Sequence, residues 1–222
     1  MKLKHLKDKI HKEFFKVLEE IGIEELRPAQ EKAIKAGLLD GKNLLVCTPT
    51  ASGKTLVAEL AMLNTILNSG GKGVYIVPLK ALATEKFEEF KKKYSHLIRI
   101  ALSIGDFDSA DPFLVDYDLI ITTSEKLDSL IRHRSPWLAM VKVVIVDEVH
   151  LLNDVSRGPT LEVLITILRQ VLKRVQIICL SATIGNPEEL AEWLDANLVI
   201  DNWRPVKLKK GVLIDDEVRF VD

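Results

Sequence analysis

Short runs of β-branched and other apolar residues alternate along the chain with longer helical patterns. Seven runs predict β-strands: Asn43–Cys47, Gly73–Val77, Arg99–Ile104, Asp118–Thr122, Lys142–Val146, Val175–Leu180 and Leu198–Asp201. Two stretches within them, Val143–Val146 and Ile177–Leu180, are apolar throughout. Continuous apolar strands are typical of parallel sheets that helices cover on both faces, so we expect a buried parallel sheet.

Between the strand runs, apolar positions recur with the 3.6-residue period of an α-helix. This period predicts five helices: Gly53–Leu67, Ala81–Lys93, Glu125–Arg132, Thr160–Leu172 and Pro187–Leu194. Strands that alternate with helices imply right-handed crossover connections. The sequence therefore predicts an α/β fold, with a mostly parallel twisted sheet of about seven strands and helices on both faces.

The two ends of the chain have patterns of their own. Apolar residues between Leu3 and Ile21 recur at spacings of three and four, which predicts an amphipathic helix within residues 1–22. After the last strand run, Trp203-Arg204-Pro205 and several lysines are typical of a linker. We expect three segments: a helix at 1–22, an α/β domain at 23–203, and a linker at 204–222 leading to a second domain that this chain lacks.

Composition and charge narrow the class of protein. Of the 222 residues, 47% are apolar and 28% are charged, which excludes a disordered tail, a collagen-like fibre and a disulfide-stapled miniprotein. The formal net charge is -1, so any nucleic acid must be held locally instead of by a basic surface. Cys47 and Cys179 lie in apolar runs and are expected to be buried thiols in a reducing compartment. No apolar run reaches the roughly 18 residues of a membrane span, and we expect a soluble cytoplasmic protein.

A phosphate-binding loop is the strongest chemical signal. Thr48–Thr55 reads Thr-Pro-Thr-Ala-Ser-Gly-Lys-Thr, follows the strand run Leu44–Cys47 and opens a helical pattern. N–H groups at a helix N-terminus bind anions, Lys54 can reach the β- and γ-phosphates, and the Thr55 hydroxyl can ligate Mg²⁺. Thr48 stands where the general pattern has its first glycine. A chance Gly-Lys-Thr loop is the weaker alternative, because the strand and helix context matches. The predicted nucleotide contacts are Thr50, Ala51, Ser52, Gly53, Lys54 and Thr55.

Two adjacent acids form the second signal. Asp147 and Glu148 follow the buried run Val143–Val146 in the sequence Asp-Glu-Val-His. Carboxylates at the end of a buried strand are costly unless a cation or hydrogen bonds compensate them. Mg²⁺ held by Asp147 would do so, and Glu148 would then orient and deprotonate the attacking water. Taken alone, the pair also fits solvent-exposed acids at a strand end; the loop at Lys54 makes that interpretation the weaker one.

Two further patterns are weaker when taken alone. The hydroxyls of Ser181 and Thr183 follow another strand run and can bond to the Asp147–His150 segment. Gln30 precedes the first strand run, and its amide can donate and accept toward the N6/N7 edge of adenine, although a solvated helix residue fits equally well. Five such segments, at Thr48, Pro78, Thr122, Asp147 and Ser181, all follow strand runs. Open α/β sheets bind ligands at that carboxyl edge.

Taken in order, these motifs resemble the first RecA-like domain of superfamily 2 helicases. More narrowly, the segments Pro78–Leu82, Thr122–Lys126, Asp147–Leu152 and Trp203–Val206 resemble archaeal DNA repair helicases of the Ski-two-like class, also called Holliday junction migration helicases. The resemblance covers about residues 20 to 212. It implies a RecA-like P-loop fold, with ATP and Mg²⁺ as cofactors and single-stranded or forked DNA as a partner.

The resemblance also implies roles for single residues. Lys54, Asp147 and Glu148 would be catalytic, Thr55 and Asp147 would hold Mg²⁺, and Gln30 would read adenine. His150, Ser181 and Thr183 would couple the state of the nucleotide to the grip on DNA. The backbone of single-stranded DNA would be held by Pro78, Leu79, Lys80, Gly105, Asp106, Thr123, Ser124 and Glu125. The aromatic residue that stacks on adenine in some relatives has no clear equivalent before Gln30.

We therefore expect the ATP-binding motor domain of a 3′-to-5′ DNA helicase that acts in repair and replication fork processing, associated with the nucleoid. In this family a second RecA-like domain supplies arginines worth about a thousandfold or more in rate. The chain contains one set of motifs, so we expect weak Mg-ATP binding, slow hydrolysis and no unwinding by the chain alone. The alternatives are a nucleotide-gated nucleic-acid-binding module without useful catalysis, a subunit of a split helicase, and an unrelated P-loop enzyme such as a small-molecule kinase.

Overall fold

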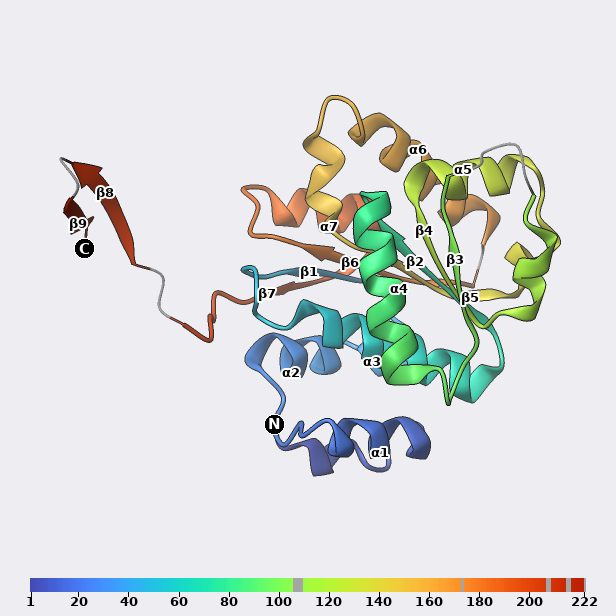
Figure 1. Ribbon diagram of the computed structural model, residues 1–222, viewed down its shortest axis with the longest axis horizontal. Coiled ribbons are helices and arrows are strands. Elements are labelled where there is room, and N and C mark those ends of the chain that lie inside the picture. Colours follow the sequence, from blue (N-terminus) through green and yellow to red (C-terminus); the bar gives the residue numbers. More distant parts are fainter. Residues whose placement is uncertain (106–109, 173, 207–208, 215–216, 222) are drawn as a thin grey trace.

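A parallel sheet of seven strands forms the centre of the computed structural model, which describes residues 1–105, 110–172, 174–206, 209–214 and 217–221. The strands are β1 (Leu44–Cys47), β2 (Lys72–Val77), β3 (Ile100–Ser103), β4 (Leu119–Thr123), β5 (Val141–Val146), β6 (Gln176–Ser181) and β7 (Asn197–Ile200). Their order in the sheet is β3-β4-β2-β5-β6-β1-β7, and all neighbours are parallel (Figure 1). The predicted RecA-like α/β fold is confirmed, and each of the seven predicted strands agrees with the structure to within one residue at either end.

Helices cover both faces of this sheet. The α-helices are α1 (Lys12–Glu20), α2 (Pro28–Lys35), α3 (Lys54–Ser69), α4 (Lys80–Tyr94), α5 (Ser124–Arg132), α6 (Gly158–Val171) and α7 (Pro187–Leu194). Short 3₁₀ helices lie at Leu3–Leu6, Leu38–Asp40, Pro112–Asp116, Pro136–Met140 and Val149–Asn153. Among the described ranges, no helix is both long and apolar enough to cross a bilayer.

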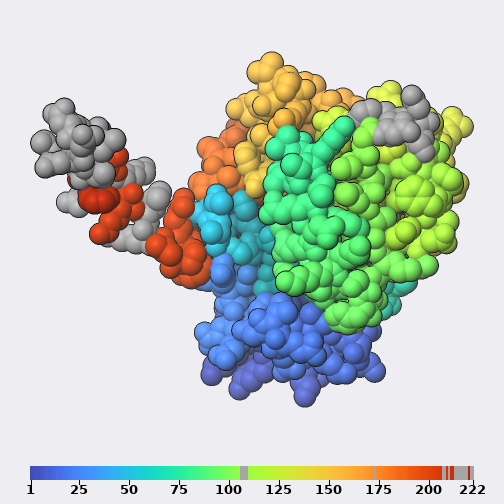
Figure 2. Space-filling view, viewed as in Figure 1, coloured from blue at the N-terminus to red at the C-terminus, as the bar shows by residue number. Residues whose placement is uncertain are grey.

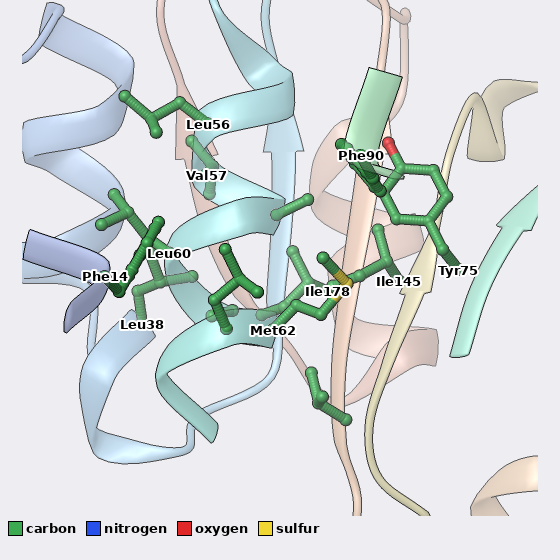
Figure 3. Packing of buried hydrophobic residues seen from close by; sticks show 14 of the residues in the cluster. Phe14, Leu38, Leu56, Val57, Leu60, Met62, Tyr75, Phe90, Ile145 and Ile178 are labelled. Carbon is green, nitrogen blue, oxygen red and sulfur yellow. The ribbon is translucent and has the colours of Figure 1, made fainter. Parts of the chain in front are cut away.

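Alternating residues of the strands pack into two separate hydrophobic layers, one on each face of the sheet. On β1, Leu44 and Val46 point into the layer that α1, α3 and α4 cover, which includes Phe14, Leu60 and Phe90 (Figure 3). The intervening residues of β1 point into the layer under α5, α6 and α7, and Cys47 and Cys179 belong to this second layer as unbridged, buried thiols. Because both faces are buried, the strands have the continuous apolar pattern from which they were predicted.

The N-terminal segment is not the single helix that its apolar spacing predicts. It consists of the 3₁₀ helix Leu3–Leu6 and the separate helix α1. The break follows from tertiary pairing: the Leu3 N–H donates to the Glu24 carbonyl at 2.8 Å, and the Leu26 N–H donates to the Met1 carbonyl at 2.8 Å. This pairing bends the chain before α1 begins. The apolar residues are buried as expected, except Ile21, which is 44% exposed.

The C-terminal segment contains a hairpin where the sequence pattern predicts only a linker. Strands β8 (Lys210–Ile214) and β9 (Glu217–Val221) pair antiparallel. Figure 1 shows the hairpin to one side of the sheet, and in Figure 2 the red C-terminal residues extend away from the rest of the molecule. Each strand has only five residues, too few for its alternation to be told from an irregular tail.

Candidate nucleotide-binding site

The loop between β1 and α3 has the shape that a phosphate-binding loop requires. Ala51 and Gly53 have φ values of 65° and 91°, in the left-handed region. A Cβ at position 53 would lie 2.6 Å from Gln30 Nε2, so only glycine fits there. Thr48, in place of the usual first glycine, is buried and its hydroxyl lies 2.7 Å from that of Ser52. The departure from the general pattern therefore adds a hydrogen bond that closes the loop.

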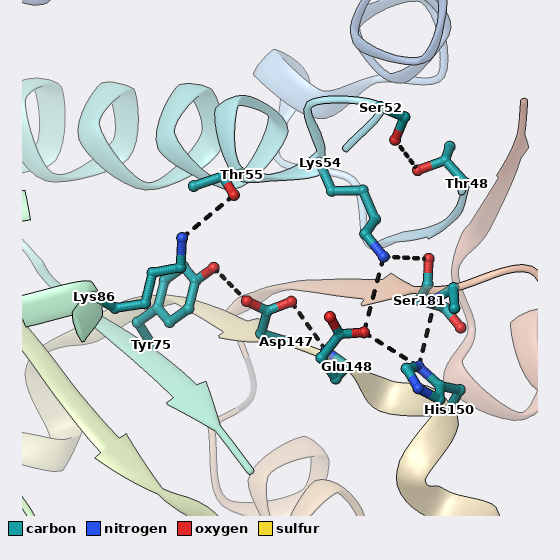
Figure 4. A network of polar contacts seen from close by, with 11 residues as sticks. Thr48, Ser52, Lys54, Thr55, Tyr75, Lys86, Asp147, Glu148, His150 and Ser181 are labelled. Atoms are coloured by element: carbon teal, nitrogen blue, oxygen red, sulfur yellow. Dashed lines mark hydrogen bonds and ion pairs between the residues drawn. The ribbon is translucent and has the colours of Figure 1, made fainter. Parts of the chain in front are cut away.

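Lys54 connects this loop to the ends of two neighbouring strands. Its Nζ donates to the carbonyl oxygen of Ser181 at 3.0 Å and lies 3.8 Å from Glu148 Oε2 (Figure 4). The Lys54 side chain is 11% exposed, so this ammonium is partly withdrawn from water while facing the pocket. Lys54 is thus within contact distance of one residue from each of two other predicted motifs.

Asp147 is held in place by a residue that the motifs did not identify. Its Oδ2 accepts a hydrogen bond from the Tyr75 hydroxyl at 2.8 Å, and its Oδ1 accepts one from the Glu148 N–H at 3.0 Å. Burial, together with the adjacent Asp147 charge, raises the pKa of Tyr75 well above its usual value. Tyr75 therefore acts as a neutral hydrogen-bond donor that orients the carboxylate. The signal in the sequence is a tyrosine inside an apolar strand, because a buried hydroxyl needs a partner.

The Tyr75→Phe variant is expected to lower the free energy of unfolding by about 1.5 kcal/mol, because it removes one hydrogen bond to a charged group. Urea denaturation at neutral pH measures this change. Tyr117→Phe is the matched control, since the Tyr117 hydroxyl bonds to none of the described residues and its loss should change stability little. Equal stability of the Tyr75→Phe variant and the unmodified chain would show that the hydroxyl does not hold Asp147.

Glu148 and His150 bring the ends of β5 and β6 together. Glu148 has φ 54°, an uncommon conformation for a residue other than glycine, and its side chain is 36% exposed toward the pocket. His150 Nδ1 lies 3.3 Å from Glu148 Oε2 and 3.4 Å from the Ala182 amide nitrogen. That ring nitrogen donates to the carboxylate when it carries a proton and accepts from the amide when it does not, so it serves only one of them at a time.

The predicted coupling residues occupy different environments. Ser181 contacts Lys54 through its main-chain carbonyl, while its hydroxyl oxygen is buried without a hydrogen-bond partner in the described part of the chain. Thr183 is exposed. The structure thus brings His150 and Ser181 to the site and leaves Thr183 at the surface.

Gln30 and Arg27 attach the start of α2 to the loop. Gln30 is 3% exposed; its Oε1 accepts from the Arg27 N–H at 2.8 Å and its Nε2 donates to the Gly53 carbonyl at 3.0 Å. Arg27 Nη1 donates to the Ala51 carbonyl at 2.7 Å, and the guanidinium lies 5.5 Å from the centre of the Trp203 ring. Gln30 therefore supports the loop directly, and its contact with adenine stays a prediction.

These side chains surround a pocket of about 460 Å³. Its lining residues are Arg27, Thr50, Ala51, Gly53, Lys54, Thr55, Val77, Leu82, Glu85, Lys86, Asp147 and Glu148. Ser52 is absent from this lining, because it is buried and its N–H donates to the Pro49 carbonyl within the loop at 3.3 Å.

The donor set of the pocket fits a magnesium triphosphate. The Thr55 hydroxyl and the Asp147 carboxylate offer the hard oxygen ligands that Mg²⁺ prefers, and Lys54 supplies positive charge for phosphates. In the described ranges, no cluster of three or more His, Cys, Asp or Glu residues is arranged to hold a metal. Mg²⁺ commonly binds through one or two protein oxygens together with substrate phosphates, which is the arrangement this pocket allows.

The residues predicted to hold DNA follow three other strands of the same edge. Pro78, Leu79 and Lys80 follow β2, and the last two are exposed. Gly105 follows β3 with φ 97°, and Asp106 lies outside the described residues. Thr123 is the last residue of β4, and Ser124 and Glu125 begin α5. Thr123 and Ser124 are buried, and the Thr123 hydroxyl caps α5 by accepting the Lys126 N–H at 3.4 Å. Leu79 and Lys80 are thus exposed where a ligand could contact them, whereas the buried Thr123 side chain caps a helix.

Comparison with known proteins gives consistent results. The family model described as DEAD/DEAH box helicase matches residues 27–190. Proteins named ATP-dependent DNA helicase Hel308 are similar: that of Methanococcus vannielii is 54% identical over 213 residues, covering 93% of this chain and 28% of the relative. That of Methanocaldococcus jannaschii is 57% identical over 213 residues, covering 93% of this chain and 18% of the relative. That of Pyrococcus horikoshii is 53% identical over 222 residues, covering the whole chain and 30% of the relative.

Solved structures agree with this result. The DUF1998 helicase MrfA bound to DNA superposes with a TM-score of 0.76 at 30% identity, covering 88% of this chain and 30% of that one. The same helicase bound to DNA and AMPPNP gives a TM-score of 0.77 at 30% identity, with the same two coverages. The chain spans less than a third of the length of all these proteins. With the family model matching most of its length, the chain belongs to the DEAD/DEAH box helicases.

Proposed function

We propose that this chain is the ATP-binding motor domain of an ATP-dependent DNA helicase, which hydrolyses ATP with Mg²⁺ and grips single-stranded DNA. The observation that carries the proposal is the convergence of Lys54, Asp147 and Glu148 on one pocket, with Lys54 Nζ 3.8 Å from Glu148 Oε2. The names of the Hel308 relatives and the DNA-bound MrfA structures support the choice of nucleic acid.

In this proposal each side chain performs one task on the triphosphate. Lys54 exchanges its bond to the Ser181 carbonyl for phosphate oxygens, and the N–H groups at the start of α3 bind the same anion. Thr55 and Asp147 hold Mg²⁺, which neutralises charge on the transferred phosphoryl group when bound. Glu148, which is partly exposed in the pocket, orients the attacking water and takes its proton.

His150 links the residue proposed to activate the water to the segment that follows β6. Its Nδ1 faces both the Glu148 carboxylate and the Ala182 amide of the segment after β6. A change in the charge or position of Glu148 during hydrolysis therefore alters which partner His150 bonds. We propose that this exchange, together with Ser181, communicates the state of the nucleotide to the DNA-binding half of the edge, and that exposed Thr183 responds through a partner domain.

In this proposal, two functions occupy different halves of one edge of the sheet. The proposed nucleotide residues of the strand ends lie at or just after the ends of β1, β5 and β6, whereas the proposed DNA residues lie at or just after the ends of β2, β3 and β4, which form the other half of the sheet. The proposal includes Gln30 as the adenine-reading residue and a second RecA-like domain that completes the site. From the resemblance it also includes 3′-to-5′ movement, a role in repair and fork processing, and a cytoplasmic, nucleoid-associated location.

The Lys80→Ala variant tests the DNA half of the proposal. Lys80 is exposed in the first turn of α4, and removing its charge is expected to weaken binding of a fluorescein-labelled oligo-dT about five-fold at low salt. Fluorescence anisotropy measures the affinity with and without Mg-AMPPNP, which is expected to change it several-fold. Lys92→Ala, an exposed lysine at the far end of α4, is the matched control and should bind like the unmodified chain. Failure of the unmodified chain to bind oligo-dT in either nucleotide state would contradict the DNA assignment.

A further inference from the structure

A chain of charged side chains connects the metal-binding end of α3 to α4. Lys86 Nζ donates to the Thr55 hydroxyl at 3.4 Å and to Glu89 Oε2 at 2.8 Å. Lys93 Nζ continues from Glu89 Oε1 at 2.6 Å to Glu59 Oε1 at 3.2 Å. Thr55 and Glu59 are four residues apart, about one turn of α3. The four contacts and this helical turn together form a closed ring across the two helices. Lys86 and Thr55 are the members of the ring that line the nucleotide pocket.

The ring is anchored in the interior of the protein. The Glu59 side chain is 4% exposed, and its burial raises the pKa of this carboxyl. Burial opposes the charge on Lys93, but the two neighbouring carboxylates outweigh it and raise the lysine pKa. Glu89 is therefore fixed between two ammonium groups, and it holds Lys86 at the mouth of the pocket. The Lys86 ammonium also lies 5.8 Å from the centre of the Phe90 ring, which further limits where it can move.

Lys86 thus places a positive charge on the oxygen that the proposed function assigns to Mg²⁺. A metal ion would bind that hydroxyl oxygen at about 2.1 Å, so an ammonium group left at its present distance would repel it. If Lys86 moved away from Thr55, it would keep its ion pair with Glu89. Resting on the proposed function, we propose that Lys86 competes with Mg²⁺ for Thr55 and sets the concentration of Mg²⁺ that nucleotide binding requires.

The test is a titration of Mg²⁺ at a fixed concentration of the fluorescent nucleotide mant-ATP, with fluorescence reporting bound nucleotide. Lys86→Gln is expected to lower the half-saturating Mg²⁺ concentration about tenfold, since it removes the competing charge. Lys86→Arg keeps the charge and should restore a requirement near that of the unmodified chain. Lys92→Gln makes the same substitution on the exposed side of α4 and should change nothing. Thermal unfolding shows that each variant is folded, and Lys86→Met serves as a second neutral variant if the glutamine variant is destabilised.

The outcomes separate this inference from the proposal on which it rests. A half-saturating Mg²⁺ concentration that is the same in Lys86→Gln and the unmodified chain overturns the competition, while nucleotide binding itself still stands. Weaker mant-ATP binding by Lys86→Gln to the same degree with and without Mg²⁺ would make Lys86 a phosphate ligand and also overturns the competition. An unmodified chain that binds no mant-ATP at any Mg²⁺ concentration overturns the proposed function and this inference together.

Discussion

The Glu148→Gln variant is expected to hydrolyse ATP 10²- to 10⁴-fold more slowly than the unmodified chain, a range of about 3 to 5 kcal/mol in activation free energy. The amide keeps the size of the side chain but cannot take a proton from water. Affinity for mant-ATP should stay within about twofold, because binding depends on the loop, Lys54 and Mg²⁺. Single-turnover hydrolysis and equilibrium fluorescence, measured on the same preparation, separate the two effects.

Glu85→Gln is the matched control for this result. Glu85 lines the same pocket, and the substitution removes the same charge. This residue lies on α4 and is not among the residues assigned to the attacking water. Its turnover should remain close to that of the unmodified chain. If Glu85→Gln were the inactive variant and Glu148→Gln the active one, the assignment of the water-activating carboxylate would be wrong.

The Lys54→Ala variant is expected to bind mant-ATP about 10- to 100-fold more weakly. The substitution removes a charge-assisted hydrogen bond to phosphate, worth about 1.5 to 3 kcal/mol when the partner is ionised. It also removes the tie between the loop and the Ser181 carbonyl, so hydrolysis should fall at least as far as binding. Fluorescence titration in the presence of Mg²⁺ measures the affinity.

Lys92→Ala gives the comparison for a lysine that faces solvent and lines no part of the pocket. Its mant-ATP affinity should match that of the unmodified chain. Equal affinities of Lys54→Ala and Lys92→Ala would show that the nucleotide does not bind where the loop begins α3.

Burial on two faces explains why the sheet could be predicted from the sequence. Runs such as Val143–Val146 are apolar because helices cover both sides, and this run lies within β5 and ends where the strand ends. The N-terminal segment shows the opposite case. Its spacing fits a helix, but main-chain pairing of Leu3 with Glu24 breaks that helix, and spacing carries no information about a partner so far along the chain.

The same distinction separates the site residues that the motifs identify from those that they do not. Lys54, Asp147 and Glu148 stand in short contiguous motifs next to predicted strands, so their convergence follows from the parallel sheet. Tyr75 and Lys86 contact the site only because β2 lies beside β5 and because side chains of α4 reach those of α3. Neither arrangement can be derived from alternation of strands and helices, since several strand orders satisfy the same pattern.

Predicted roles and observed contacts also differ in kind for some residues. The sequence predicts that the amide of Gln30 faces adenine, and in the structure this amide accepts from the Arg27 N–H and donates to the Gly53 carbonyl. The sequence predicts a nucleotide contact for Ser52, whose hydroxyl in the structure lies beside that of Thr48 and which does not line the pocket. A sequence motif identifies which residues belong to a site, whereas the atoms that each of them contacts depend on the three-dimensional structure.

A crystal structure of this chain with AMPPNP and Mg²⁺ tests the central claim most directly. The account predicts electron density for the triphosphate at the start of α3, with Lys54 on a phosphate oxygen and the metal ion bound by Thr55 and Asp147. Density for the nucleotide in another cavity, such as the one lined by His150 and Asn186, with Lys54 still bonded to Ser181, would contradict it.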